Sequence, residues 1–220
     1  MKNCWYFLAL TSFFSYASED LVQLPKFDEN TFSFWEKEVF SGETDYKPIV
    51  PEYILHAKSD GTASGLVFKK KIDIYNTPYM NWSWKADNRL KSLPERAKAG
   101  DDYVARIYLV INDSLLPWDT KVLNYVWSST DSIGEHWDSP YAGSQVKMLS
   151  VRDSNSKTDV WYFEKRNVFE DMIDVFGDQG SRQANIKSYQ YIDAVALMTD
   201  TDDSESRAES YYGSISFSDK

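Results

Sequence analysis

The sequence predicts a mostly β domain, built as a two-sheet antiparallel sandwich of the jelly-roll type with one short helix near residues 168–176. Runs rich in Val, Ile, Tyr, Phe and Trp recur along the chain, and clusters of Gly, Pro, Asn and Asp bound them. Aromatic residues make up 16% of the sequence, which suits the half-buried surfaces of pleated sheets. So many short strands in a chain of this length are typical of two packed antiparallel sheets.

The expected strands follow one another from residue 32 to residue 217. They cover residues 32–40, 53–58, 66–72, 79–85, 103–112, 122–128, 146–152, 160–166, 191–199 and 213–217. Two segments between them, 87–102 and 130–144, hold turn-forming residues and few aliphatic ones. We expect both to be long surface loops, which often carry function.

The segment 168–176 is the one stretch with a helical pattern. Its apolar side chains fall at helical spacing on one face, namely Phe169, Met172, Ile173 and Phe176. Asn167 is suited to cap the start of this helix, and Gly177 is suited to end it.

Strand alternation predicts which side chains face the interior of the sandwich. In the strand 103–112 the odd positions are continuously apolar: Tyr103, Ala105, Ile107, Leu109 and Ile111. We expect them to point into the core, with Arg106 and Tyr108 on the other face. Trp82 and Trp84 share one face of their strand, and we expect both to be core residues.

The first residues predict export from the cytoplasm. Lys2 precedes an apolar run that ends at Ser15-Tyr16-Ala17, which is the order of a secretory signal with a small-residue cleavage site. We therefore expect residues 1–17 to be a signal peptide and residues 18–220 to form a single β-sandwich domain, periplasmic or secreted. Cys4, the one cysteine, would leave with the signal, so the mature domain needs no disulfide at this length.

The charge balance excludes some partners. The formal net charge is −10 at pH 7, and loss of Lys2 makes the chain one unit more negative. Nucleic acid and anionic lipid are disfavoured, because both need a basic surface. No stretch after the signal is long and apolar enough for membrane insertion.

Polar residues in the middle of apolar strands are the first candidate site. They are Arg106, Asn124, Glu164 and Arg166, and alternation places Asn124 beside Val122 and Val126. One interpretation is a structural network of paired charges that connects one sheet face. The alternative is a polar groove that binds a ligand through the bidentate donors of arginine.

Two tryptophans are a second candidate site. Trp118 and Trp137 lie in expected loops among polar residues, with Pro117 near the first and Pro140 near the second. An exposed indole in such a loop can stack on a sugar ring.

An acidic stretch near the C-terminus is a candidate metal site. Residues 200–205 contain four carboxylates, and Asp200, Asp202 and Asp203 are the expected ligands of a calcium ion. The pattern is not an EF-hand, since Glu205 stands where the central glycine belongs and Tyr211 where the bidentate Glu belongs. A solvated acidic loop with no cofactor is the simpler interpretation, and calcium is the alternative.

The motifs of the common enzyme families are missing from the sequence. There is no Gly-x-Ser-x-Gly elbow, no His-Glu-x-x-His, no phosphate loop and no dinucleotide fingerprint. Acid–base chemistry by a pair of Asp or Glu residues needs no fixed spacing, so glycoside hydrolysis stays open, with His136 as a helper.

Several strings taken together resemble the bacterial domain of unknown function family 3047. They are NWSWK at 81–85, GDDYVAR at 100–106, NYVW at 124–127, EKRNV at 164–168 with Asp171 and Phe176-Gly177, MTDTD at 198–202 and YG at 212–213. The resemblance runs from about Phe32 to Phe217 and implies an exported bacterial protein with no established activity. The same strings contain Asp102 and the four mid-strand polar residues, which adds Asp102 to the candidate ligand-binding set.

Three functions follow as hypotheses. The first is a non-catalytic module that binds a glycan or another small polar ligand of the cell envelope, because sandwich folds with aromatic faces host such sites. The second is an enzyme on envelope polysaccharide that uses Asp or Glu as acid and base. The third is a periplasmic structural or assembly protein. Two carboxylates about 5 to 10 Å apart in a groove would favour the enzyme.

Overall fold

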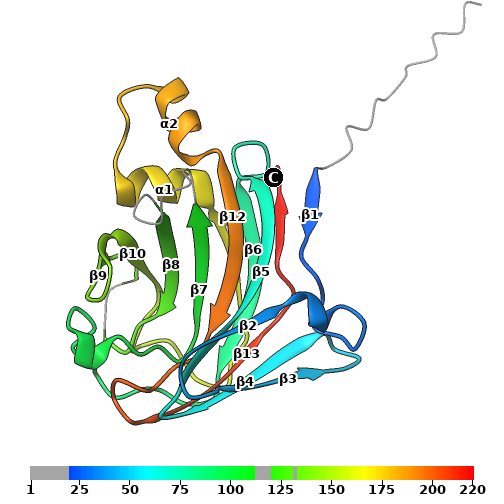
Figure 1. The fold of residues 1–220 in the computed structure, drawn as a ribbon, viewed down its shortest axis with the longest axis vertical. Helices are drawn as coiled ribbons and strands as arrows, with labels where there is room; N and C mark the ends of the chain where they lie inside the picture. Colours follow the sequence, from blue (N-terminus) through cyan, green and yellow to red (C-terminus); the bar gives the residue numbers. More distant parts are fainter. Residues whose placement is uncertain (1–19, 112–119, 131–132) are drawn as a thin grey trace, which may run out of the picture.

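The computed structural model describes residues 20–111, 120–130 and 133–220, and within them it forms two β-sheets. In sheet A, β6 (Tyr79–Ala86) pairs along one edge with β11 (Tyr162–Asn167) and along its other edge with β14 (Ser216–Ser218) and then β13 (Arg207–Tyr212). β1 (Leu21–Gln23) pairs with β14, and β13 is followed by β4 (Ile54–Asp60) and β3 (Asp45–Ile49). Sheet B contains β2 (Glu36–Ser41), β5 (Ala63–Asp73), β12 (Tyr191–Met198), β7 (Arg106–Ile111), β8 (Lys121–Trp127), β10 (Gly143–Arg152) and β9 (His136–Ser139). The mostly β, two-sheet prediction is confirmed (Figure 1).

One strand pair departs from the antiparallel expectation. β10 pairs with β8 in parallel, while β9 pairs with β10 in antiparallel fashion at the edge of sheet B. The chain leaves β8, passes through β9 and turns back, so β10 rather than β9 lies beside β8. β9 itself lies in the segment 130–144, where the sequence predicted only a loop.

Other differences concern short or polar elements. The segment 32–40 begins with a 3-10 helix, Phe32–Phe34, before β2 starts. β1, β3 and β13 were not expected, because they are short or rich in charged residues. The long loop before β7 contains a further 3-10 helix, Lys98–Gly100.

The predicted helix is confirmed as α1 (Val168–Phe176). Asn167 caps it by accepting a hydrogen bond from the Glu170 amide at 3.1 Å, and Gly177 ends it with φ of 97°. A second helix, α2 (Arg182–Tyr189), was not predicted, since its sequence has no apolar stripe. Neither helix in the described part of the chain is long and apolar enough to cross a membrane.

The core lies between the two sheets and is rich in aromatic rings. Trp82 and Trp84 are buried there as expected, and Trp82 stacks on Tyr125 of sheet B with ring centroids 5.3 Å apart. Ile107 and Leu109 also face this core. Alternation therefore holds along β7 itself. It fails for Tyr103, which precedes the strand and packs on the opposite side of sheet B.

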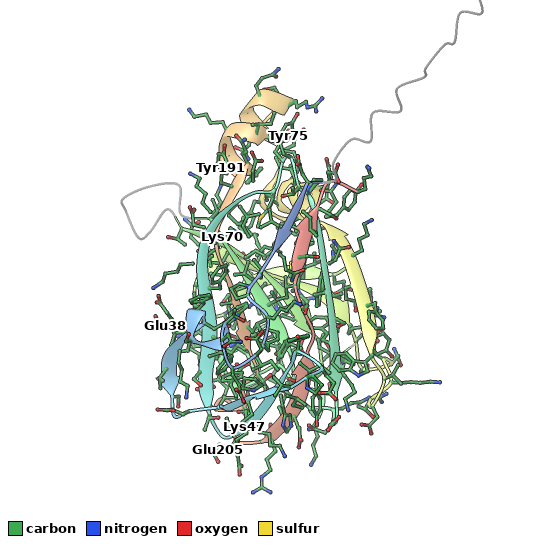
Figure 2. All side chains as sticks on the ribbon, turned by 90° about the vertical axis from the view of Figure 1, so that its right-hand side faces the viewer. Glu38, Lys47, Lys70, Tyr75, Tyr191 and Glu205 are labelled. Carbon is green, nitrogen blue, oxygen red and sulfur yellow. The ribbon has the colours of Figure 1, made fainter. Side chains whose placement is uncertain are left out.

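The two ends of the sandwich carry different segments. In Figure 1, α1 and α2 lie at one end, and the chain between β12 and β13 lies at the other. Figure 2 shows the same separation in side chains, with Tyr75 toward the helical end and Glu205 at the far end. The acidic segment after β12 is therefore remote from the helices.

Candidate functional site

A groove of about 460 Å³ lies on the face of sheet B that points away from the core. Its floor comes from adjacent strands: Arg106 and Tyr108 of β7, Asn124 of β8, Met148 of β10 and Met198 of β12. Strand register brings them together, because Arg106 is opposite Met198, Tyr108 is opposite Asn124, and Asn124 is opposite Met148. Alternation correctly placed Arg106 and Tyr108 on the face of sheet B that points away from the core and carries the groove.

Arg106 is held rigidly at the floor of the groove. Its Nη2 donates to Asp200 Oδ2 at 2.5 Å, and the two side chains are only 6% and 1% exposed. Its guanidinium lies 5.1 Å from the ring centroids of both Tyr103 and Tyr108, one cation–π contact to each ring. The buried pair therefore orients the arginine before any ligand arrives.

Carboxylates gather at one end of the groove. We call them the acidic cluster: Asp101, Asp102, Asp200, Asp202 and Asp203. The first two precede β7 and the other three follow β12, and these strands are antiparallel neighbours. The start of one strand therefore meets the end of the other, which brings together residues that are far apart in the sequence.

Asp102 connects the two halves of this cluster. One of its oxygens accepts from the amide of Ser204 at 2.6 Å and the other from the amide of Asp203 at 3.3 Å. It therefore fixes the backbone that carries Asp202 and Asp203.

Carboxylates of the acidic cluster raise one another's pKa values. Burial raises the pKa of Asp101, and nearby Asp203 and Asp102 add to the shift although Arg106 opposes it. Burial likewise raises the pKa of Asp202, together with the charges of Asp203 and Asp102. The cause in both cases is that a crowded, partly desolvated carboxylate resists ionisation.

Two buried polar atoms of the groove floor lack hydrogen-bond partners among the described residues. They are Asn124 Oδ1 and Arg106 Nε. Asn124 is only 1% exposed, and its Nδ2 lies 3.5 Å from Met148 Sδ. In the structure Nδ2 faces this sulfur, and Oδ1 faces no donor. Buried polar atoms without partners are rare in folded proteins.

Aromatic side chains form the rim. Phe40 is 72% exposed and sits at a β-bulge of the edge strand β2, where the register with β5 shifts between Val39 and Ser41. On the opposite side, Tyr141 donates to Asp203 Oδ1 at 2.5 Å, and this bond raises its pKa to about 12. Lys98 lies 4.9 Å from the centroid of the Tyr141 ring.

Comparison with known proteins identifies the family but no activity. Residues 33–216 match the family described as "Protein of unknown function (DUF3047)". The chain belongs to this family. The resemblance seen in the sequence is therefore confirmed. No curated protein sequence matches the chain.

Solved structures with a similar fold include carbohydrate-binding modules and a cellulase. A family 11 carbohydrate-binding module from Clostridium thermocellum has a TM-score of 0.47 and 11% identity, over 92% of this chain and 95% of that one. The Cel12A-derived cellulase of Rhodothermus marinus has a TM-score of 0.48 and 9% identity, over 90% and 100%. The CBM29-2 module has a TM-score of 0.42 and 6% identity, over 92% and 87%.

Glu164 and Arg166 of this DUF3047 protein are not in the groove. Both lie on β11 in sheet A, where Glu164 binds Arg152 with two hydrogen bonds of 2.6 and 2.8 Å and accepts from Trp84 Nε1 at 2.9 Å. Arg166 donates two hydrogen bonds of 2.6 Å to Asp171 of α1. Glu164 and Arg166 therefore fit the first interpretation of the sequence, a structural network of paired charges, and not the ligand-binding groove.

The tryptophan expectations met different outcomes. Trp137 lies in β9, not in a loop, and is 8% exposed, so the expected exposed indole is wrong. It packs with Tyr103, Val126 and Met148 in a small apolar cluster beneath the groove wall. Trp118 lies outside the described residues.

The carboxylates that meet most closely differ from the predicted calcium ligands. Asp102, Asp200 and Asp202 each place one oxygen within 4.8 Å of the others. Asp203, the third predicted ligand, binds Tyr141 instead. Asp102 was predicted as a ligand-binding residue, and its proximity to Asp200 comes from strand pairing that the sequence does not show.

Five residues that line the groove were not predicted from the sequence. Met148 and Met198 follow from alternation once the register of β8, β10 and β12 is known. Phe40 and Tyr141 carry no such signal, since one lies at a bulge and the other in the β9–β10 turn. For Asp101 the sequence did offer a signal, because it is the neighbour of Asp102 in the string GDDYVAR that suggested the family.

Proposed function

We propose that the groove on sheet B binds a glycan or another hydroxyl-rich, polar ligand of the cell envelope. The observation that carries the proposal is the free acceptor Asn124 Oδ1, buried at the floor of the groove beside the fixed Arg106. A buried polar atom without a partner is costly, and a ligand hydroxyl would satisfy it. The volume of about 460 Å³ and the few polar groups among apolar side chains suit a small-molecule site.

Exposed aromatic rings at the rim support the same function. Phe40 and Tyr141 are 72% and 55% exposed. Large apolar rings that are left in water next to a groove offer a stacking surface for the apolar face of a sugar.

Binding is better supported than hydrolysis. An acid–base pair needs two carboxylates that are free to exchange protons with the substrate. Asp102 and Asp200 are occupied, by backbone amides and by Arg106. Release of reducing ends from a bound glycan would favour the enzyme hypothesis over ours.

We also propose that the domain acts outside the cytoplasm, which is where such a ligand occurs. The support is the order of charge, apolar run and small residues in positions 1–17 of the sequence. That segment lies outside the described residues.

Replacing Phe40 by Ala is expected to weaken glycan binding about tenfold, as loss of one aromatic stacking contact does. The measurement is a glycan array on the purified domain, followed by calorimetry of the strongest array hit with parent and variant. Thermal stability should not change, because Phe40 is 72% exposed and contributes little to the core.

The matched control is Phe163→Ala. Phe163 is 81% exposed and lies on β11 of sheet A, so it is an equally exposed phenylalanine far from the groove. We expect its affinity to equal that of the parent. Equal losses in both variants, or none in either, would remove the groove as the binding site.

We infer further that the acidic cluster needs no bound metal. Both oxygens of Asp102 accept backbone hydrogen bonds, and Asp200 binds Arg106 and the amide of Tyr103. A metal ion would have to compete with these partners. The melting temperature is expected to differ by less than about 1 °C between millimolar calcium and chelator. A rise of several degrees in calcium would assign Asp102, Asp200 and Asp202 as a calcium site instead.

A further inference from the structure

Most polar groups that line the groove are hydrogen-bond acceptors, so a ligand there must supply donors. Asp101, Asp200, Asp202 and Asp203 line it, and Arg106 is the one cationic side chain among its lining residues. The guanidinium of Arg106 already binds Asp200. The lining therefore carries an excess of negative charge that no side chain of the groove balances.

Asp202 and Asp203 hold most of this accessible charge. In the described part of the chain, no Lys or Arg nitrogen lies within 4.0 Å of either carboxylate. Asp102 holds their backbone in place through the amides of Asp203 and Ser204. Both are half-buried, so their charges are less screened than those of a fully exposed loop.

A second group on the groove floor, separate from the carboxylates, also requires a hydrogen-bond donor. Asn124 Oδ1 is a buried acceptor without a partner among the described residues, while Nδ2 contacts Met148 Sδ. It lies on β8 and does not belong to the acidic cluster. A ligand that fits both places must donate hydrogen bonds along its length.

The rim favours the same kind of ligand. Tyr141 and Phe40 present exposed rings on either side of the groove. The face of an aromatic ring attracts a cation, as the Lys98 ammonium 4.9 Å from the Tyr141 ring centroid already illustrates. The exposed ring of Phe40 offers a further face to a ligand ammonium.

We propose that the ligand of the groove carries protonated amines, as in a glycan of amino sugars with free amino groups. The ammonium would donate to Asp202 and Asp203, and a neighbouring hydroxyl or amine would donate to Asn124. This inference rests on the proposed glycan-binding function and specifies its ligand class. The same carboxylates would repel an acidic glycan.

The test compares three β-1,4-linked hexasaccharides that differ at one position of each sugar. Glucosamine hexamer carries an amine there, N-acetylglucosamine hexamer an acetamide and cellohexaose a hydroxyl. Calorimetry under conditions in which the amine is protonated should show the amine hexamer binding about tenfold more tightly than either other, since hydrogen bonds to charged groups are the stronger ones. The preference should shrink as salt is added.

Two groove variants identify the residues responsible. Asp202→Asn and Asp203→Asn keep the size of each side chain and remove its charge, and each should lower the affinity for the amine hexamer about tenfold. Affinity for a neutral glycan should hardly change. Asp174→Asn is the matched control, because Asp174 is an exposed aspartate on α1 at the other end of the molecule.

Each outcome decides between the two proposals. Equal affinity for the amine, acetamide and hydroxyl hexamers would overturn the amine preference and leave the glycan-binding groove intact. Equal losses in Asp174→Asn would show general attraction to an acidic protein and would also overturn the preference. Failure of all three hexamers, with an array hit that depends on Phe40, would reject the amine ligand but not the groove. An empty array would reject both.

Discussion

Replacing Arg106 by Leu is expected to lower the free energy of unfolding by about 3 to 5 kcal/mol, the usual cost of removing one partner from a buried ion pair. Asp200 is 1% exposed and would lose its shortest hydrogen bond, the 2.5 Å contact with Arg106 Nη2. The change would also remove the cation from between Tyr103 and Tyr108. Denaturant unfolding of parent and variant measures the difference directly.

Two further measurements test whether the unpaired carboxylate of Asp200 causes the loss of stability. Adding Asp200→Asn to the Leu variant should restore part of the lost stability, since the amide needs no cation. The deficit should also shrink as the pH falls. Burial already raises the pKa of Asp200, and loss of Arg106 raises it further, so the penalty exists above this folded-state pKa and fades as the carboxyl protonates. A Leu variant as stable as the parent would contradict the paired role of Arg106.

The fold and one face of the site were predictable because they follow from short-range periodicity. Alternation along β7 has a period of two, so it places Arg106 and Tyr108 on the face opposite Ile107 and Leu109 without knowledge of any contact. Asn124 joins them only through the pairing of β7 with β8. The same rule, with burial of large rings, placed Trp82 and Trp84 in the core. These predictions needed only the identity of neighbouring residues.

The rest of the site depends on long-range pairing. Asp102 and Asp200 meet because β7 and β12 are neighbours, and nothing within either segment indicates this. Phe40 joins the rim through a bulge, which breaks the alternation that a prediction would use. Glu164 has the same mid-strand pattern as Arg106 but lies in the other sheet, so similar local patterns led to different places.

Replacing Asp171 by Ala is expected to cost about 3 kcal/mol of stability and to leave glycan binding unchanged. Asp171 is buried on α1 and accepts three hydrogen bonds of 2.6 Å, two from Arg166 and one from the hydroxyl of Tyr125. Tyr125 is fully buried, so its hydroxyl would lose its partner without gaining water. Denaturant unfolding gives the stability, and calorimetry with the strongest array hit gives the affinity.

The matched control for this substitution is Asp174→Ala on the same helix. Asp174 is exposed, so the same change there should cost less than about 0.5 kcal/mol. A double-mutant cycle with Arg166→Ala then isolates the pair: Arg166→Ala should cost less when Asp171 is already Ala. Additive costs would show that Arg166 and Asp171 do not stabilise the fold together. We expect unchanged affinity because the pair contacts the inner face of sheet B through Tyr125, whereas the groove lies on the outer face. Lost affinity in a stable, folded Asp171→Ala protein would contradict this and return Arg166 to the ligand-binding residues.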